Sequence, residues 1–373
     1  MSSRNEKKSS SGVSVLKVVL KIVGRSLAVL GVTVLLVLIL VVGACFLAMH
    51  GPSPAFRSQF AMFAYETSAL KWLPKLFLGS DQFEKIIAEN TMPEVAEGTA
   101  SNTELIQIPD ETAIADENVR PLVIEEINGG TYHGYMMIIQ DPSTVFVGTV
   151  DQFRQGDGDV VKKFCERYNA IGGVNGGEFV DMGSYSYTAC PVGGVISQGQ
   201  PVYENNNVGK WNLVCITNDN KLILLKGYSV AQALELNVRD AVHVKHETGP
   251  FLIIDGEPLE VPSIDVYGGG KNPRTAIGQR SDGAILMCVI DGRQASSLGA
   301  TFKEMIDIMQ DYGAVNAACL DGGTSTQMEY NGQTVNNPYS PTGPRRCPTA
   351  FLIMSTEANS SYDALALMNG EEN

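Results

Sequence analysis

The chain begins with a polar, basic segment and then becomes continuously apolar. Residues 27–49 form a run of 23 positions without a charged side chain. At about 1.5 Å per residue, a helix of this length spans the ~30 Å hydrocarbon core of a bilayer. The pattern predicts a transmembrane helix over 27–49 that follows a basic tail over 1–26. A cleaved signal peptide is the alternative.

The charges before this run predict its orientation. The first fifty residues contain six basic side chains and one acidic side chain, all of them before the apolar run. Because positively charged flanks stay in the cytoplasm, we expect a single-pass protein of the cell membrane with an extracytoplasmic body. Residues 42–45 also resemble a bacterial lipoprotein cleavage box. Lipid on Cys45 would then replace the helix and leave the body on the same side.

Beyond the apolar run, the polarity pattern changes twice. Residues 50–118 begin with mixed aromatic and basic positions, which predict a helical stem, and end with a Glu-, Asp-, Thr- and Pro-rich part, which predicts a solvated acidic linker. Residues 119–357 contain short apolar runs separated by Gly, Asn and Asp, and residues 358–373 form a polar tail. We therefore expect the α+β class: a β-rich mixed-sheet domain with few helices, preceded by one N-terminal transmembrane helix.

One stretch of this domain has the pattern of a helix. Thr301 and Glu304 have the spacing of a capping box, and Gly313 ends the apolar periodicity. The expected helix joins two apolar runs, 284–290 and 315–320, so the unit is predicted to be strand, helix, strand with parallel strands.

This unit predicts where two carboxylates lie. Asp291 and Asp321 each follow directly after one of its strands. Parallel strands end at the same edge of a sheet, which is where ligands bind in such sheets. The strands are ~4.8 Å apart if they are neighbours and about twice as far apart if another strand lies between them.

Three glycine-rich segments supply the candidate chemistry. Each sets a carboxylate, an amide or a guanidinium beside residues that let the backbone approach a ligand closely. The segments are 174–179, 272–278 and 319–326. The candidate catalytic residues are Asp321, Asp291, Glu178 and Arg274. The candidate substrate-binding residues are Asn175, Gly176, Gly177, Arg293, Gly322, Gly323, Ser325 and Thr326.

The overall charge excludes one class of partner. The chain has 27 Lys and Arg against 41 Asp and Glu, and without its first fifty residues the net charge is about −19. Such a body repels nucleic acid. Six of the seven cysteines follow the apolar run, an even number that leaves disulfides open. No zinc spacing is present and no cofactor is required. A calcium or magnesium ion between Asp291 and Asp321 is an open alternative.

Five motifs in one order carry a resemblance to a known family. They are Asn-Gly-Gly-x-Phe from 175, Gly-Pro-Phe-Leu from 249, Arg-Thr-Ala-Ile-Gly from 274, Asp-Gly-Arg from 291 and Leu-Asp-Gly-Gly-x-Ser from 320. Together they resemble the phosphodiester glycosidase family, which includes bacterial envelope proteins of the exopolysaccharide type. The resemblance implies hydrolysis of sugar-1-phosphodiesters such as those of N-acetylglucosamine. The site positions that it implies are Asn175, Arg274, Asp291, Arg293, Asp321 and Ser325.

A mechanism follows as a hypothesis. Arg274, supported by Arg293, would stabilise the charge of the leaving phosphate. Asp321 would activate water or attack the anomeric carbon, with Asp291 or Glu178 as the second carboxylate. The amide of Asn175 and the hydroxyls of Ser325 and Thr326 would bind the sugar. The expected partners are a glycan or glycosyl-phosphate polymer and the membrane. A glycosyl or sugar-phosphate transferase of envelope assembly and a non-catalytic glycan-binding module are the alternatives.

Overall fold

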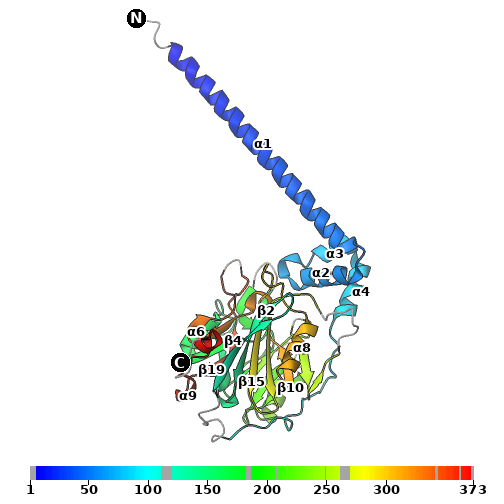
Figure 1. The fold of residues 1–373 in the computed structure, drawn as a ribbon, viewed down its shortest axis with the longest axis vertical. Coiled ribbons are helices and arrows are strands. Elements are labelled where there is room, and N and C mark those ends of the chain that lie inside the picture. Colours follow the sequence, from blue (N-terminus) through cyan, green and yellow to red (C-terminus); the bar gives the residue numbers. More distant parts are fainter. Residues whose placement is uncertain are drawn as a thin grey trace. The chain divides into compact units, whose positions relative to one another are not determined.

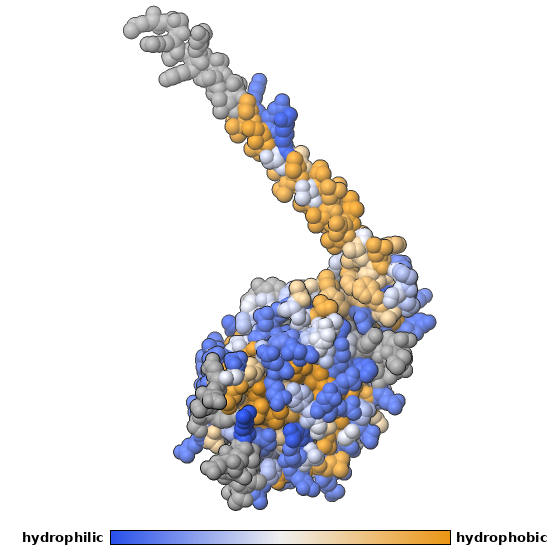
Figure 2. Space-filling model, viewed as in Figure 1, coloured by the Kyte–Doolittle hydropathy of each residue, from blue (hydrophilic) through white to orange (hydrophobic). Residues whose placement is uncertain are grey.

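The computed structural model describes residues 6–110, 120–181, 186–205, 209–247, 249–260, 269–340, 343–360 and 363–370. The chain divides into two compact units, Met1–Arg57 and Ser58–Asn373. The first unit contains one long helix, α1 (Glu6–His50), which appears as an uninterrupted blue rod in Figure 1. Its stretch Leu16–His50 is long and apolar enough to cross a membrane. Figure 2 shows hydrophobic side chains over most of its visible surface.

Short helices follow α1, and everything from Ser58 on belongs to the second unit. They are α2 (Pro54–Glu66), the 3-10 turn η1 (Ser68–Leu70), α3 (Leu73–Leu78) and α4 (Ser80–Asn90). The part of the chain after α4, which was expected to be a solvated linker, is largely exposed in its described residues but contacts the sheets at single positions. Ile106 is 1% exposed, and Ala100 forms a β-bridge with Leu225. Isolated apolar side chains and backbone hydrogen bonds hold this polar segment in place, and neither feature produces a periodic pattern in the sequence.

The rest of the unit is rich in strands, which confirms the α+β class. Its largest sheet has the order β1-β2-β15-β14-β16-β12-β13. These strands are β1 (Leu122–Asn128), β2 (His133–Ile139), β12 (Phe251–Ile254), β13 (Glu257–Pro258), β14 (Arg274–Arg280), β15 (Ile285–Ile290) and β16 (Ala314–Cys319). All of its described neighbouring strands pair antiparallel.

Two five-stranded sheets and one hairpin complete the described strands. The first sheet has the order β10-β9-β11-β7-β8 and the second β18-β17-β4-β19-β3, and β5 pairs with β6. The strands of the first sheet are β7 (Val195–Ser197), β8 (Gln200–Tyr203), β9 (Trp211–Thr217), β10 (Leu222–Tyr228) and β11 (Val238–His243). Those of the second and of the hairpin are β3 (Val145–Thr149), β4 (Ala170–Asn175), β17 (Met328–Tyr330), β18 (Gln333–Thr334), β19 (Thr349–Met354), β5 (Phe179–Asp181) and β6 (Ser186–Pro191).

One apolar core lies between the three larger sheets. It includes buried side chains from each of them, such as Met287, Val214 and Phe351. The other face of each sheet packs against a helix. These helices are α8 (Phe302–Asp311) on the largest sheet, α7 (Val230–Glu235) on the sheet of β9 and α6 (Val161–Tyr168) on the sheet of β4. The ends of strands from all three sheets can therefore meet at one place on the surface.

The expected strand, helix, strand unit is present. Helix α8 has the predicted capping box, in which the Thr301 hydroxyl accepts from the Glu304 backbone amide at 3.2 Å. Strands β15 and β16 each pair antiparallel with β14, so they run parallel to each other with β14 between them. Asp291 and Asp321 consequently lie at the same edge, and β14 begins between them with Arg274. Figure 1 shows α8 in orange beside these strands.

Small elements complete the described chain. They are the 3-10 turns η2 (Pro142–Thr144) and η3 (Gly323–Ser325), and the helices α9 (Glu357–Ser360) and α10 (Ala364–Met368). Helix α10 falls in the expected polar tail, yet it packs on β1 and buries Ala364. The seven cysteines all lie within the described residues and are free thiols. Burial raises the pKa of Cys165 and of Cys319 to about 12, so these thiols stay protonated at neutral pH.

Candidate functional site

The ends of strands from the three sheets meet around Asp321. The backbone amide of Asp321, just after β16, donates to the Gly176 carbonyl after β4 at 3.2 Å. The backbone amide of Glu178 donates to the carbonyl of His243, the last residue of β11, at 3.1 Å. Two predicted glycine-rich segments are thereby brought together, although 145 sequence positions separate Gly176 from Asp321.

Close backbone packing explains two of the predicted glycines. A Cβ atom on Gly176 would lie 2.3 Å from the Thr349 hydroxyl, and one on Gly177 would lie 2.4 Å from the His243 carbonyl oxygen. Both distances are far below van der Waals contact, so a side chain at either position would push the strand ends apart. The glycines of this segment therefore shape the site by allowing two sheets to approach each other.

Asn175 has a structural role beside them. Its Nδ2 donates to the Asp321 carbonyl at 2.7 Å, and its Oδ1 accepts from the Thr275 hydroxyl at 2.8 Å. The backbone amide of Gln327 also donates to this Oδ1, at 3.2 Å. The side chain is 0% exposed. Asn175 was predicted to bind sugar, whereas the structure places its amide under the Asp321 loop, where it fixes the backbone that carries the carboxylate.

Asp321 has the most perturbed environment of the predicted residues. Removal of water raises the pKa of its carboxyl well above the ordinary value, and the charge of Glu178 raises it further. A hydrogen bond from Ser325 and the charges of Lys245 and Arg345 act in the opposite direction but do not cancel the effect. A buried carboxyl whose pKa is raised by a neighbouring carboxylate is a common arrangement for acid and base chemistry.

Glu178 is held by a lysine that sequence analysis missed. The Lys245 ammonium lies 3.1 Å from Oε2 of Glu178, and that glutamate side chain is 6% exposed. Burial lowers the pKa of Lys245, but the charge and hydrogen bond of Glu178, together with the charges of Asp321 and Glu247, outweigh burial, so the pKa is raised and the ammonium stays charged. Lys245 lies two residues beyond β11. Lys245 does not lie in a glycine-rich segment. Its contact with Glu178 becomes visible only in the folded structure, where the two sheets meet.

Arg345, in a Pro- and Gly-rich segment, adds a further positive charge. Its guanidinium carbon lies 5.4 Å from the centre of the Phe179 ring, and its Nη2 lies 3.3 Å from Oδ2 of Asp181. Because its charge also acts on Asp321, the two carboxylates are flanked by cations from different loops.

Arg274, predicted to grip phosphate, is instead bound within the protein. Its Nη2 lies 2.6 Å from Oε2 of Glu66, the last residue of α2, and its guanidinium carbon lies 3.9 Å from the centre of the Phe302 ring. The side chains of Arg274 and Glu66 are 4% and 6% exposed. In this structure, Arg274 fixes the start of β14 to α2.

Arg293 extends from the Asp291 side of the sheet edge toward Asp321. Its Nε and Nη2 donate to Oδ1 of Asn272 at 3.1 and 2.9 Å, and a Cβ on Gly323 would lie 3.4 Å from its Nη2. Burial, followed by the nearby charge of Arg274, lowers the pKa of Arg293 to about 10. Gly323 has a φ of 64°, a conformation that favours glycine. A half-buried cation beside the Asp321 loop favours a bound anion.

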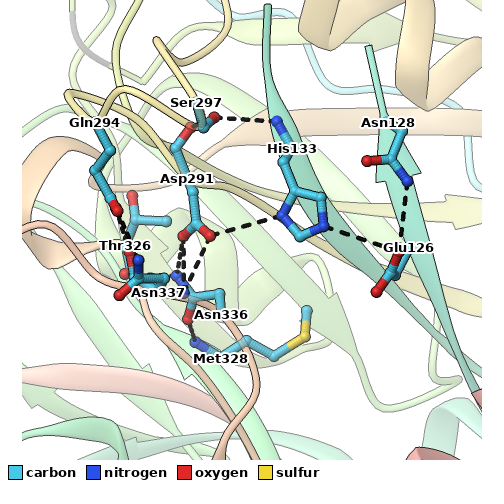
Figure 3. Close-up of polar contacts among 10 residues, drawn as sticks. All are labelled: Glu126, Asn128, His133, Asp291, Gln294, Ser297, Thr326, Met328, Asn336 and Asn337. Carbon is cyan, nitrogen blue, oxygen red and sulfur yellow. Dashed lines mark hydrogen bonds and ion pairs between the residues drawn. The ribbon is translucent and has the colours of Figure 1, made fainter. Parts of the chain in front are cut away.

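Asp291 lies in a separate cluster, shown in Figure 3. Its Oδ1 accepts from Nδ2 of Asn336 at 2.8 Å, and the backbone amide of Asn337 donates to Oδ1 and Oδ2 at 3.1 and 3.0 Å. Its Oδ2 lies 3.9 Å from Nδ1 of His133. Among the described residues, the contacts of Asp291 do not include Asp321, so the structure brings Glu178 rather than Asp291 to the central carboxylate.

The loop after Asp321 supplies two buried hydroxyls that differ in their hydrogen bonding. Ser325 is 2% exposed and hydrogen-bonds the Asp321 carboxyl. Thr326 is 1% exposed, and its hydroxyl has no hydrogen-bond partner in the described part of the chain. A Cβ on Gly322 would lie 2.9 Å from the carbonyl oxygen of Pro273, so this glycine allows the loop to pack on the residue before β14.

Within the described residues, no three His, Cys, Asp or Glu side chains lie close enough together to hold a metal ion. The groups that do converge are two carboxyls, two guanidiniums, an ammonium and a serine hydroxyl. They belong to Asp321, Glu178, Arg293, Arg345, Lys245 and Ser325. Paired carboxyls beside cations suit the hydrolysis of a bond next to an anionic group. The fold and the site together define an α+β protein with a two-carboxyl, cation-flanked site at the junction of three sheets.

Comparison with known proteins identifies the family. The phosphodiester glycosidase family model matches residues 168–354, so the chain belongs to this family. That range contains the residues of the Asp321 site.

Among solved structures, the chain resembles the catalytic domain of zebrafish N-acetylglucosamine-1-phosphodiester alpha-N-acetylglucosaminidase, auto-inhibited by its pro-peptide. The TM-score is 0.50 at 19% identity, over 71% of this chain and 97% of that one, a likeness of fold. A putative exported protein of Burkholderia pseudomallei gives a TM-score of 0.45 at 16% identity, over 60% and 74% of the two chains. The SPbeta prophage-derived uncharacterized protein YomE of Bacillus subtilis (strain 168) is 45% identical over 67 residues, 18% of this chain. The match spans only 10% of the length of that curated relative.

Proposed function

We propose that the chain hydrolyses the bond between a sugar anomeric carbon and a phosphodiester oxygen, and that α1 anchors it in a membrane. The observation that carries the proposal is the Asp321 carboxyl, whose pKa is raised by burial and by Glu178 beside Lys245. Family membership supports the reaction class. The name of the zebrafish relative suggests N-acetylglucosamine-1-phosphodiesters as the first substrates to test.

The two carboxyls have different environments, which suits a division of roles. Glu178 forms an ion pair with Lys245, so it supplies a fixed negative charge that can stabilise positive charge at the anomeric carbon. Asp321, with its raised pKa, exchanges a proton with the attacking water. The bond from anomeric carbon to phosphodiester oxygen breaks, the water oxygen joins the carbon, and the phosphate leaves as a monoester anion.

Cations near Asp321 suit the departing phosphate. The charges of Arg293 and Arg345 both interact with the Asp321 carboxyl, and Arg293 also lies against Gly323 of the Asp321 loop. A glycosyl phosphate is already a good leaving group, so it needs charge stabilisation more than protonation. In our proposal, these two arginines replace Arg274, whose guanidinium is engaged by Glu66, as the phosphate-binding groups.

The experiment uses the full chain in detergent micelles with a phosphodiester of N-acetylglucosamine-1-phosphate, and it measures release of free N-acetylglucosamine with and without EDTA. Asp321→Asn and Glu178→Gln each remove one carboxyl with little change of shape. Asp282→Asn is a matched control, because Asp282 also precedes a glycine but belongs to an exposed hairpin turn and pairs with Arg280.

We expect each site variant to lower the rate by about 100-fold or more, as loss of a catalytic acid or base commonly does, and the control to keep it. Full turnover by Asp321→Asn would overturn the assignment. Transfer of the sugar to an added acceptor in place of water would identify a transferase. Loss of activity in EDTA would assign a divalent cation to the site.

A further inference from the structure

A cavity of about 490 Å³ opens beside Asp291, at the same sheet edge as Asp321. One wall is the end of the β1–β2 hairpin, where Asn128 pairs with His133 and the backbone amide of Gly129 donates to the Tyr132 carbonyl at 2.9 Å. The other walls are the segment 291–297 and the segment 335–337. Three chain segments far apart in the sequence therefore enclose a space of the size that holds a small ligand.

Hydrogen bonds between these walls give the cavity a fixed shape. The Ser297 hydroxyl donates to the Asp291 carbonyl at 2.5 Å and accepts from the His133 backbone amide at 3.0 Å. On the opposite wall, the Asn337 side chain donates to Gln294 at 2.6 Å. Figure 3 shows Asp291 between His133 on one side and Asn336 and Asn337 on the other. The lining is therefore preorganised, which lowers the entropic cost of binding.

The chemistry of the lining selects the class of ligand. The described lining residues include one carboxylate, one imidazole and several amides and hydroxyls, but no lysine or arginine. Lys271, which donates to the hydroxyl of the lining residue Thr131, is ion-paired with Glu304 at 2.6 Å. A phosphate would meet the Asp291 carboxylate without a free cation to balance it. The lining thus disfavours an anion and suits an uncharged ligand with many hydroxyls.

Several polar atoms are placed to contact such a ligand. The Asp291 Oδ2 and the His133 Nδ1 are 3.9 Å apart, too far for a direct hydrogen bond, and a hydroxyl oxygen beside them can reach both. The ring of Tyr135 packs edge-on against His133 with centroids 5.0 Å apart and lines the same cavity. An aromatic ring with adjacent acceptors matches a sugar ring, which has an apolar face and a rim of hydroxyls.

The cavity is linked to the Asp321 loop through Asn336. Its Nδ2 donates to Asp291 and to the Thr326 carbonyl at 3.3 Å, and Thr326 follows directly after Ser325. Arg293 leaves the Asp291 segment in the other direction and lies against Gly323. A substrate bound at Asp321 with its phosphate near Arg293 therefore has a polar, cation-free cavity close by.

We propose that this cavity is a second subsite, which binds an uncharged sugar unit of an oligosaccharide or polymer substrate. The proposal rests on the proposed function for the role of the sugar, but the binding itself can be measured without turnover. It assigns Asp291 to the recognition of sugar hydroxyls, together with His133 and Tyr135.

Gly130 provides a substitution that fills the cavity without disturbing the fold. It lines the cavity, its backbone is not in the left-handed region, and an added Cβ meets no atom within 4 Å. Gly130→Trp would occupy the space, and Gly130→Ala is the matched control. Asn337→Ala removes one lining amide. Its control is Asn218→Ala, because Asn218 is also exposed and makes a similar amide–amide hydrogen bond, to Asn237 at 2.7 Å.

The experiment titrates chitotriose, cellotriose and maltotriose into the full chain by calorimetry, in a detergent without a sugar headgroup, and inorganic phosphate into the same sample. We expect at least one trisaccharide to bind, with affinity about tenfold or more weaker in Gly130→Trp and unchanged in Gly130→Ala. Asn337→Ala should weaken it severalfold, by about one hydrogen bond, and Asn218→Ala should not. The affinity for phosphate should not respond to Gly130→Trp.

Two results would overturn the subsite. One is the failure of all three trisaccharides to bind, and the other is binding that Gly130→Trp leaves intact. Weaker phosphate binding in Gly130→Trp would contradict the uncharged character of the ligand. Trisaccharide binding without release of N-acetylglucosamine would keep the subsite and refute the proposed function, while the reverse would keep the proposed function and refute the subsite.

Discussion

At the scale of single residues, the protonation state of the Asp321 carboxyl depends on opposing influences on its pKa. Burial and Glu178 raise its pKa, while Ser325, Lys245 and Arg345 lower it. If Asp321 acts as a base, turnover requires the deprotonated form. The rate should therefore fall on the acidic side at a higher pH than an ordinary aspartate would give.

The neighbouring charges allow this pH dependence to be shifted in both directions. Glu178→Gln removes a negative charge and should move the acidic limb of the residual kcat/KM profile to lower pH. Lys245→Met removes a positive charge and should move it to higher pH. Each profile would be measured with the N-acetylglucosamine-1-phosphodiester substrate. Shifts in the same direction for both variants would show that another group controls the limb.

The same carboxyl predicts an effect on stability. A group whose pKa is raised in the folded state contributes stability below its unfolded pKa, and that contribution is lost as the pH rises through the folded pKa. Asp321→Asn does not titrate, so its Tm relative to the wild type should increase between acidic and neutral pH. Asp282→Asn, at an exposed turn, should show no such trend. A Tm difference for Asp321→Asn that does not change with pH would contradict the raised pKa.

Part of this site is visible in the sequence and part is not, for a physical reason. Asp321 and Glu178 lie in glycine-rich segments, whose backbone freedom is visible locally. Lys245 lies 67 residues from Glu178, and its contact exists only because two sheets meet. The family resemblance indicated Asn175 and Arg274 as site positions, but their roles depend on partners such as Glu66, which is 208 positions from Arg274.

At the scale of elements, one buried ion pair joins α2 to the start of β14. Removing one partner of a buried pair leaves an uncompensated charge, so Glu66→Gln should lower the free energy of unfolding by about 3–5 kcal/mol. Glu89→Gln is the control, because Lys85 and Glu89 form an ion pair with side chains 75% and 51% exposed. That change should cost under about 1 kcal/mol. Chemical denaturation of the full chain measures both, and equal effects would contradict the structural role of Glu66.

Short sequence motifs predicted individual helices and strands better than they predicted which strands pair with each other. The capping box of α8 depends on residues close together in sequence, and it is confirmed. The position of β14 between β15 and β16 depends on which apolar surfaces fit together across the whole sheet. The sequence therefore predicted that Asp291 and Asp321 share an edge but left open whether a strand separates them.

At the scale of the whole molecule, the charge pattern predicts a topology. The flank before the apolar run holds six basic side chains and one acidic side chain, whereas acidic side chains outnumber basic ones after it, which favours a cytoplasmic N-terminus and an external domain. Protease added to intact cells, or to spheroplasts where an outer layer intervenes, should digest an epitope tag placed after residue 370 and spare one placed at residue 1. Protection of the C-terminal tag until the membrane is lysed would contradict this orientation.

The most direct test of the central claim follows the oxygen of water. The full chain would hydrolyse an N-acetylglucosamine-1-phosphodiester in water enriched in oxygen-18, and mass spectrometry would locate the label. We expect label on the sugar and none on the phosphomonoester, with loss of turnover in Asp321→Asn and not in Asp282→Asn. Label on the phosphomonoester would mean attack at phosphorus, which would contradict a glycosidase mechanism at this site.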